Sequence, residues 1–369
     1  MAEGGTLLLF RNLPVVPVSM VHQHVALGGP VWPDFAAQTM ARHCRAGLPV
    51  DREPPAPESW AVVDRPAVWG GFLDRAFGHC VAEHLPRLPL ALRERPDDLY
   101  LFTVDPGVTR DSLGGWVWQV FDWLGLPADQ VHLVTEPLMV ASLRVAAQGE
   151  ALPNEVPGPE YLAALAARQG GLALKRSEMT YVSREGLAAG GRGVHAGESY
   201  LAGLLRARGV AVMNPGAMPI RAQLAAYAGA GHLVFAEGSA LHGRQLLGAV
   251  DQQITVLRRR PGRSIARGAL GPRCTALRYY DVTRDSLMCY WKNGVKRPDP
   301  ALRFYHLPLL HHALAEIGLD LAAAWDEGAF RAAAEADVRA WIAWQKPGAA
   351  RLAEYDATLT RLGLAGWRG

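Results

Sequence analysis

The chain has 369 residues, which is too long for one compact core and fits two domains. Half of the residues are hydrophobic and 20% are charged, a composition typical of a globular protein. The net charge of +3 is close to neutral for this length and no RNA- or DNA-binding motif is present, so nucleic acid is not an expected partner.

The N-terminal residues predict a first strand rather than a targeting segment. The apolar run at residues 6–10 is short and follows Glu3 instead of basic residues, unlike a signal peptide. No run reaches the roughly 18 apolar residues that a membrane helix needs. The 4 cysteines lack Cys-x-x-Cys spacing, so neither a disulfide framework nor a zinc site is expected. We therefore expect a cytoplasmic, bacterial protein.

Residues 1–155 are expected to form a first α/β domain. Its predicted elements, in chain order, are a strand at 6–10, a helix at 33–45, a hairpin pair at 60–63 and 66–69, a helix at 77–93, a strand at 99–103, a helix at 114–124 and a strand at 130–134. Pro86 and Pro89 should bend or divide the helix at 77–93.

A helical stretch at 154–171 is expected to cross to a second α/β domain at residues 172–305. A strand at 179–183, a helix at 198–208, a strand at 210–213, a helix at 219–230 and a strand ending near 236 form a βαβαβ series. The tail at 306–369 is rich in Ala, Leu and Trp at helical spacing, so we expect helices that pack against the second domain or fold back on the first.

Two strands of this series end in residues suited to an anion. The strand before Glu237 passes through Gly238 and Ser239 into a helical pattern, which leaves backbone N–H groups unpaired. The earlier strand ends on Ser183 and Arg184, a hydroxyl and a guanidinium that could meet the same anion. Because parallel strands bind ligands beyond their carboxyl ends, the two motifs predict one diphosphate site.

Each motif also has an ordinary structural explanation. Gly238 and Ser239 could be a simple strand-to-helix turn with Ser as the N-cap, and Arg184 could be a solvated surface residue. The order of the motifs along a βαβαβ series is what favours a binding site. The loop at 213–219 follows another strand end and is the expected nucleobase side.

His79 and Glu83 are four residues apart, so on a helix they share one face. Either group could act as a general base, and histidine is better matched to neutral pH. The alternative is that Glu83 only pairs with a structural histidine. His242 sits one turn into the helix after Gly238 and could donate to a phosphate, or could be a surface residue.

No Asp-x-Asp phrase follows a predicted strand, and divalent cations need such oxygen ligands. We therefore expect neither a metal nor another cofactor, and a diphosphate would be met by Arg184 with Arg192 as a further cation. The arginine-rich run at 258–263 is typical of a solvated face, or of contact with a lipid-linked acceptor at an anionic membrane surface.

Four separated phrases resemble the glycosyltransferase family 61 proteins, which are often labelled capsular polysaccharide biosynthesis proteins. They are Tyr-Val-Ser-Arg at 181–184, Met-Pro-Ile-Arg-Ala-Gln at 218–223, Glu-Gly-Ser-Ala-Leu-His at 237–242, and the His79 helix ending in Leu-Pro-Arg-Leu. The similarity covers about residues 60–250. It departs from the family at Ala196 and Gly197, where Asn-Glu is common, and at Glu237, where a His-Gly-Ala phrase is common.

The resemblance implies a GT-B-like fold, with two Rossmann-like domains facing a cleft and helices at the C-terminus. It implies an inverting, metal-independent transfer of a sugar from a nucleotide-sugar donor to a cell-surface glycan or lipid-linked glycan. The expected location of the protein is the cytoplasm, with peripheral contact at the inner face of the membrane. His79 and Glu83 would be catalytic. The expected donor-binding residues are Ser183, Arg184, Arg192, Glu237, Gly238, Ser239, Ala240 and His242.

Two other functions fit the same sequence. A nucleotide-sugar epimerase or hydrolase would use the same phosphate site but would turn over the donor without an acceptor. A catalytically silent binding protein could scaffold polysaccharide assembly, and the departures at Ala196, Gly197 and Glu237 leave that alternative open.

Overall fold

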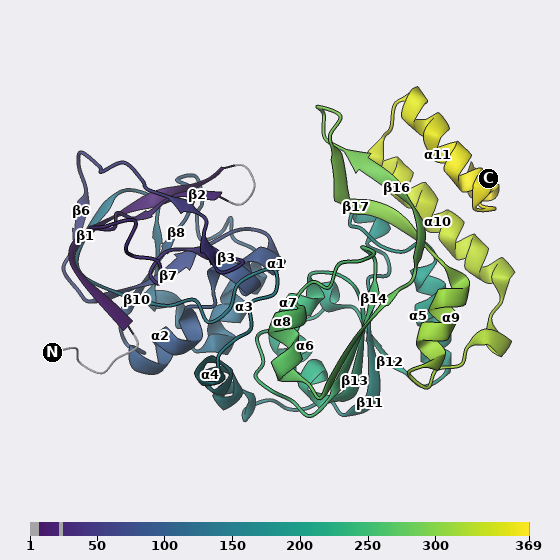
Figure 1. Ribbon diagram of the computed structural model, residues 1–369, viewed down its shortest axis with the longest axis horizontal. Coiled ribbons are helices and arrows are strands. Elements are labelled where there is room, and N and C mark those ends of the chain that lie inside the picture. The colour runs from purple at the N-terminus through teal and green to yellow at the C-terminus, as the bar shows by residue number, and fades with distance from the viewer. Residues whose placement is uncertain (1–6, 22–24, 369) are drawn as a thin grey trace.

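A computed structural model describes residues 7–21 and 25–368. The chain forms an N-terminal half built on a mixed sheet and a C-terminal half built on a parallel sheet, and the two halves lie side by side (Figure 1). A hairpin and helices at the end of the chain extend the C-terminal half. The protein is therefore an α/β protein, as the sequence predicted.

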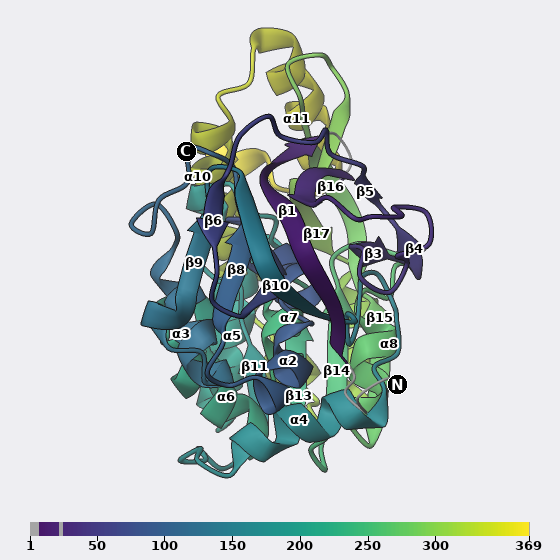
Figure 2. The same cartoon turned by 90° about the vertical axis from the view of Figure 1, so that its left-hand side faces the viewer.

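The N-terminal half contains a sheet with the strand order β5-β2-β1-β10-β7-β8-β9 (Figure 2). Its strands are β1 (Leu7–Val21), β2 (Val25–Pro30), β5 (Asp51–Arg52), β6 (Ala61–Val63), β7 (Ala67–Phe72), β8 (Leu99–Thr103), β9 (Val131–Val134) and β10 (Leu138–Ala146). The remaining elements are β3 (Cys44–Arg45), β4 (Leu48–Pro49), α1 (Phe77–His79), the π-helix η2 (Cys80–His84), α2 (Leu88–Glu94), α3 (Gly115–Leu124), the 3-10 helix η3 (Ala128–Gln130) and α4 (Pro159–Gln169).

The central strands β7 and β8 are buried along their whole length because both faces of the sheet are covered. Successive side chains point to opposite faces, so Tyr100 and Phe102 pack toward the helices while Leu101 packs into a separate core on the other face. The predicted strand at 99–103 and the helix and strand that follow it are confirmed.

Two predictions for the N-terminal half are wrong. The segments at 60–63 and 66–69 are not a hairpin, because β6 and β7 both run parallel to β10 and pair with successive stretches of it. Residues 33–45 do not form a helix but turns that lead into β3. The Arg42 side chain holds this loop, donating from Nε to Asp51 Oδ1 at 2.8 Å and from Nη1 to the Phe35 carbonyl at 3.4 Å.

The first strand is also longer than predicted. Of the predicted 6–10 segment, Thr6 lies outside the described residues, and β1 continues to Val21 between the antiparallel partners β2 and β10. The predicted helix at 77–93 is divided into α1, η2 and α2, as expected from Pro86 and Pro89.

The C-terminal half contains a five-stranded parallel sheet and a long two-stranded hairpin. The sheet strands are β11 (Ser177–Val182), β12 (Ala211–Met213), β13 (Ala230–Ala236), β14 (Gln253–Arg258) and β15 (Ala276–Asp281), and the hairpin strands are β16 (Thr283–Tyr290) and β17 (Lys296–Tyr305). The helices are η4 (Ala188–Gly190), α5 (Glu198–Ala207), η5 (Pro215–Ala217), α6 (Ile220–Gly229), α7 (Ala240–Arg244), α8 (Arg267–Leu270), η6 (Gly271–Arg273), α9 (Leu307–Ala315), η7 (Ala322–Ala324), α10 (Glu327–Gln345), α11 (Ala349–Arg361) and η8 (Ala365–Arg368).

The parallel sheet has the order β12-β11-β13-β14-β15, so its first strand lies between its second and third. Helices cover both faces, as in doubly wound sheets. Along β13, Leu233 and Phe235 pack with α6 and α7, whereas Val234 packs with α5 and α9. The predicted βαβαβ series is confirmed, and it forms the part of the sheet that carries the anion motifs.

The C-terminal helices pack on the second half, which decides between the two alternatives left open by the sequence. Helix α9 lies near β15, and α10 packs against α5 and η4. A separate apolar core joins α10 and α11 to the β16–β17 hairpin through Trp341, Tyr355 and Phe304. No helix in the described part of the chain is both long and apolar enough to cross a membrane.

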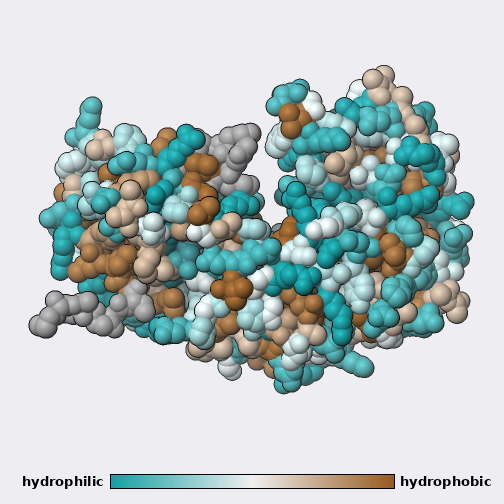
Figure 3. All heavy atoms as spheres, in the orientation of Figure 1, coloured by the Kyte–Doolittle hydropathy of each residue, from teal (hydrophilic) through white to brown (hydrophobic). Residues whose placement is uncertain are grey.

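The two halves share a continuous apolar core rather than meeting only at a hinge. Residues of α3 and the adjoining helices pack with α6 and α7 in one cluster. The Trp123 indole donates to the Leu246 carbonyl at 3.0 Å across this junction. A buried ion pair of Arg273 with Glu150, at 2.9 Å, also joins the second half to the end of the first. A hollow remains between the halves on the face shown in Figure 3.

Candidate functional site

The two predicted anion motifs lie at neighbouring strand ends. The chain leaves β11 toward β12 on one side, and β13 then returns to pair with β11 on the other side. Ser183 and Arg184 follow β11, and residues 237–240 follow β13. The gap between such diverging connections is where doubly wound sheets bind ligands, so the topology places both motifs at the expected position.

The Arg184 side chain spans the distance between these motifs. Its Nε donates to the carbonyl of Gly193 at 2.9 Å, and its backbone N–H donates to Glu198 Oε1 at 2.6 Å. The guanidinium group lies against Gly238, where an added Cβ atom would overlap Nη1. Glycine at position 238 thus allows the arginine to cross the turn, and the two motifs meet as predicted.

A pocket of about 370 Å³ opens beside Arg184. Its walls come from both halves of the protein. The lining residues are Phe77, Trp116, Gln119, Ser183, Arg184, Leu187, Asn214, Pro215, Gly216, Met218, Ile220, Gln223, Ser239 and Ala240. Four of these were predicted to bind the donor, namely Ser183, Arg184, Ser239 and Ala240.

The loop predicted for the nucleobase side forms one wall of this pocket and is held in a fixed shape. The Gln223 amide donates to the carbonyls of Pro215 and Met218, each at 2.9 Å. The Asn214 side chain accepts a hydrogen bond from the Gly216 backbone at 3.1 Å. The N-terminal half contributes Phe77, Trp116 and Gln119 to the lining, and two of these are aromatic. A preformed pocket with an aromatic wall and few polar groups is typical of small-molecule sites.

The candidate catalytic pair forms as predicted on the helix that enters this wall. His79 ends α1, and its Nδ1 lies 2.6 Å from Oε2 of Glu83 in the adjoining π-helix. Arg45 approaches the other carboxylate oxygen, at 3.3 Å. Burial alone would raise the pKa of Glu83, but the hydrogen bond from His79 and the charge of Arg45 outweigh it and lower the pKa. Glu83 is therefore a buried carboxylate that orients the half-buried His79 ring.

Helix α1 packs directly on α7, which begins after the Gly238 turn. A Cβ atom on Gly78 would lie 2.9 Å from Cδ2 of His242 and 3.3 Å from Cβ of Ser239. Only a residue without a side chain allows the two helices to approach so closely. The helix that ends in the candidate base thus contacts the turn of the candidate anion site, although His79 itself does not line the pocket.

His242 supports this contact rather than lining the pocket. It is buried, and its Nδ1 lies 2.5 Å from the side-chain oxygen of Gln245. Burial lowers the pKa of His242 to about 4, a shift that the hydrogen bond to Gln245 only partly offsets. The ring is therefore neutral at physiological pH, and His242 is a buried residue that does not line the pocket.

Glu237 also has a different role from the predicted one. Its Oε2 accepts from the backbone N–H groups of Arg259 and Arg260 at 2.7 and 2.8 Å, and its Oε1 accepts from Arg260 Nε at 2.9 Å. The carboxylate ties the end of β13 to the end of β14 and does not line the pocket. Arg192 is exposed and does not line it either, although its positive charge acts on Arg184.

The arginine run at 258–263 is not a uniformly solvated face, because two of its members pack behind the anion site. Arg259 is 4% exposed and donates to the Asp299 carbonyl at 2.8 Å, while Arg260 pairs with Glu237. Burial lowers the pKa of Arg259, and the charges of Arg184, Arg260 and Arg303 lower it further. Arg263 remains exposed.

The sequence interpretation missed this group of four arginines, Arg184, Arg259, Arg260 and Arg303. Arg303 is on β17, and only the fold of the hairpin brings it near the parallel sheet. The positive charges of neighbouring arginines lower one another's pKa, and a bound anion would offset their mutual repulsion. The group therefore makes the surroundings of Arg184 favourable for negative charge.

Glu198 is a further residue that the sequence did not assign to the site. It begins α5, is buried, and accepts from the hydroxyls of Tyr181 and Ser183 at 3.1 and 3.3 Å as well as from the Arg184 backbone. Burial raises the pKa of Glu198 to about 7, although these hydrogen bonds and the charge of Arg184 oppose the shift. Glu198 fixes the loop after β11, one residue beyond the position where the family resemblance would place a glutamate.

Comparison with known proteins assigns no family to the chain. No protein-family model matches the chain, and a search of curated proteins finds no significant match. In residues 7–21 and 25–368, no three or more His, Cys, Asp or Glu side chains are grouped so that they could hold a metal ion.

Proposed function

We propose that this protein is a glycosyltransferase that moves a sugar from a nucleotide-sugar donor to a cell-surface or capsular glycan. The observation that carries the proposal is the pocket at the β11–β13 strand ends, which is lined by Arg184, Ser239 and, from the helix that ends in His79, Phe77. A nucleotide-sugar donor needs a cation for its diphosphate and a preformed pocket for its nucleoside. The transfer of its sugar needs a base nearby. In this proposal the two halves act as the two domains of a GT-B enzyme.

The donor diphosphate would bind Arg184, which can form charge-assisted hydrogen bonds with phosphate oxygens. The three neighbouring arginines raise the local positive potential. Ser239 and Ala240 are small residues at the turn, which leaves room for the diphosphate. Helix α7 has only 5 residues, so Arg184 rather than the helix dipole provides most of the attraction for the diphosphate. The nucleobase would lie along the loop that contains Asn214 and Met218.

In the proposed transfer step, His79 is the general base. The acceptor hydroxyl oxygen attacks the anomeric carbon, and the imidazole of His79 takes the hydroxyl proton as the new C–O bond forms. The bond from the anomeric carbon to the donor phosphate breaks, and the nucleoside diphosphate leaves with the electron pair. Arg184 stabilises the negative charge on that leaving group, and Glu83 stabilises the protonated ring of His79. A single displacement of this kind inverts the anomeric centre.

The proposal includes a cytoplasmic location at the inner face of the membrane, where a lipid-linked acceptor would be reached. The exposed Arg263 is the member of the arginine run that could contact anionic lipid.

Product analysis tests the proposed function. The protein is incubated with a panel of nucleotide-sugars, with and without glycan acceptors. A glycosylated product that requires the acceptor supports the proposal. Donor turnover without acceptor would instead identify an epimerase or hydrolase, and donor binding without turnover would identify a silent binding protein.

Arg184→Ala and Arg206→Ala are the matched pair for the donor site. Arg184→Ala should weaken nucleoside diphosphate binding by roughly 1.5–3 kcal/mol. Arg206 is exposed on α5, pairs with Glu185 and does not line the pocket, so Arg206→Ala should leave the affinity unchanged. Equal affinity of both variants in calorimetry would remove Arg184 from the donor site.

A further inference from the structure

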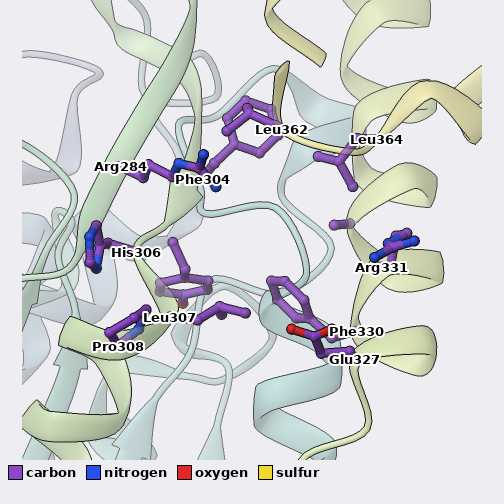
Figure 4. A pocket seen from close by; sticks show the side chains of 12 residues that line it. Arg284, Phe304, His306, Leu307, Pro308, Glu327, Phe330, Arg331, Leu362 and Leu364 are labelled. Atoms are coloured by element: carbon purple, nitrogen blue, oxygen red, sulfur yellow. The ribbon is translucent and has the colours of Figure 1, made fainter. Parts of the chain in front are cut away.

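A second cavity, of about 380 Å³, lies in the C-terminal half and shares no lining residue with the pocket beside Arg184. It is enclosed by the β16–β17 hairpin, the start of α9, the first turns of α10 and the end of α11 (Figure 4). The lining residues are Arg284, Phe304, Tyr305, His306, Leu307, Pro308, Glu327, Phe330, Arg331, Ala334, Leu362 and Leu364.

The interior of this cavity is aromatic and apolar. Phe304 and Tyr305 are buried on β17, and Phe330 faces them from α10, with rings of Tyr305 and Phe330 6.5 Å apart. Leu307 also lines the space, and Figure 4 shows it beside Phe330. These walls fit the apolar face of a ring-shaped ligand.

The rim carries more positive than negative charge. Arg284 and Arg331 lie on opposite sides of the cavity and Glu327 lies beside Phe330 (Figure 4). Within residues 7–21 and 25–368, neither arginine forms an ion pair through its side chain, whereas the nearby Arg361 pairs with Asp285 at 3.1 Å. With two arginines and one glutamate, the rim has a net positive charge, which favours a ligand with a negative group.

His306 adds a donor to the rim. Its Nδ1 accepts a hydrogen bond from the Leu309 backbone at 3.3 Å and so caps α9. With Nδ1 as the acceptor, Nε2 is the ring nitrogen that donates. The rim therefore offers donors from His306, Arg284 and Arg331, and an acceptor from Glu327.

We propose that this cavity binds an acidic sugar, that is, a sugar ring bearing a carboxylate or a phosphate. The C–H face of the ring lies on Phe304 and Phe330, the negative group meets Arg284 or Arg331, and a ring hydroxyl donates to Glu327. The inference stands apart from the proposed glycosyl transfer, because it uses a different pocket and concerns binding alone.

Calorimetry with the full chain tests this site, using glucuronate, glucose 6-phosphate, neutral glucose and inorganic phosphate as probes. One of the two acidic sugars should bind with a dissociation constant of about 1 mM or tighter, and which one binds decides between carboxylate and phosphate. Glucose and inorganic phosphate should bind at least tenfold more weakly. No binding of either acidic sugar, or equal binding of glucose or inorganic phosphate, would overturn the proposal.

Surface variants locate the bound probe. Arg331→Gln and Arg284→Gln should together weaken binding by about tenfold or more, and both side chains are exposed, so the fold should be kept. Arg339→Gln is the matched control, because Arg339 is exposed on the same helix and lies outside the cavity. Arg184→Ala must also leave the affinity unchanged. A loss of binding in Arg184→Ala would place the probe in the other pocket and overturn the second site.

Discussion

Gly238 lies directly against the guanidinium group of Arg184, so closely that a Cβ atom at position 238 would overlap Nη1 of the arginine. The arginine is held on its other side by the Gly193 carbonyl, 2.9 Å from Nε. The position of the arginine that is proposed to bind phosphate thus depends on a residue without a side chain.

Gly238→Ala should therefore displace Arg184 and weaken nucleoside diphosphate binding by about tenfold or more. The backbone at 238 is not in the left-handed region, so the substitution should leave the fold intact. Calorimetry measures the affinity, and Gly203→Ala is the control because Gly203 is exposed on α5 with nothing within 4 Å of an added Cβ.

The double variant makes this test sharper. If Gly238→Ala acts by moving Arg184, adding it to Arg184→Ala should cause little further loss of affinity. Additive losses would contradict the explanation and would indicate that Gly238 contacts the ligand independently.

Glu198 should make stability depend on pH. Burial raises the pKa of Glu198 from 4.5 to about 7 in the folded protein. Between these pH values the folded state holds a proton that the unfolded state has released, so this group's contribution to stability is lost as pH rises from about 4.5 to 7. Glu198→Gln keeps an acceptor for the Arg184 backbone but cannot ionise.

The free energy of unfolding of Glu198→Gln, minus that of the wild type, should therefore increase between pH 5 and 7 and level off above 7. Denaturant titrations at several pH values measure it. The buried His242, whose pKa burial lowers to about 4, titrates in both proteins and largely cancels in the difference. A difference that stays constant across this range would show that Glu198 is ionised throughout.

Much of the candidate site was predictable because it depends on local signals at strand ends. Ser183, Arg184 and Ser239 follow short apolar runs, and a βαβαβ series requires parallel strands whose carboxyl ends share one edge. The His79–Glu83 contact was predictable for the same reason, since it needs only helical spacing between two side chains.

The remaining features depend on contacts between distant segments. Glu237 turns toward the end of β14, and Arg303 reaches the site from the hairpin; neither position follows from the flanking residues. Similarly, β6 and β7 resemble hairpin strands in sequence, but the long partner β10 aligns both in one direction. Tertiary pairing decides such cases, and one sequence does not reveal it.

Glycosyl transfer should survive chelation. The sequence has no Asp-x-Asp phrase at a strand end, and Arg184 with its neighbouring arginines can meet the diphosphate charge instead. Activity is compared after dialysis against EDTA and after addition of Mg²⁺ or Mn²⁺. Loss of activity that a divalent ion restores would show that a metal takes part and would contradict the proposed role of the arginines.

His79→Ala should lower turnover by about 10²–10⁴ while nucleotide-sugar binding stays near normal, because the base acts on the acceptor hydroxyl and not on the diphosphate. Single-turnover kinetics and calorimetry separate the two quantities. His312→Ala, at an exposed position on α9, is the control for loss of a histidine and should retain full turnover.

Glu83→Gln distinguishes the two possible roles of the carboxylate. The Glu83 side chain is buried and lies 2.6 Å from Nδ1 of His79, which indicates that it orients the ring and stabilises its protonated form. Its loss should then cost less turnover than His79→Ala. If Glu83→Gln lowers turnover as much as His79→Ala does, the carboxylate itself is the base. Full turnover in both variants would remove the pair from the mechanism.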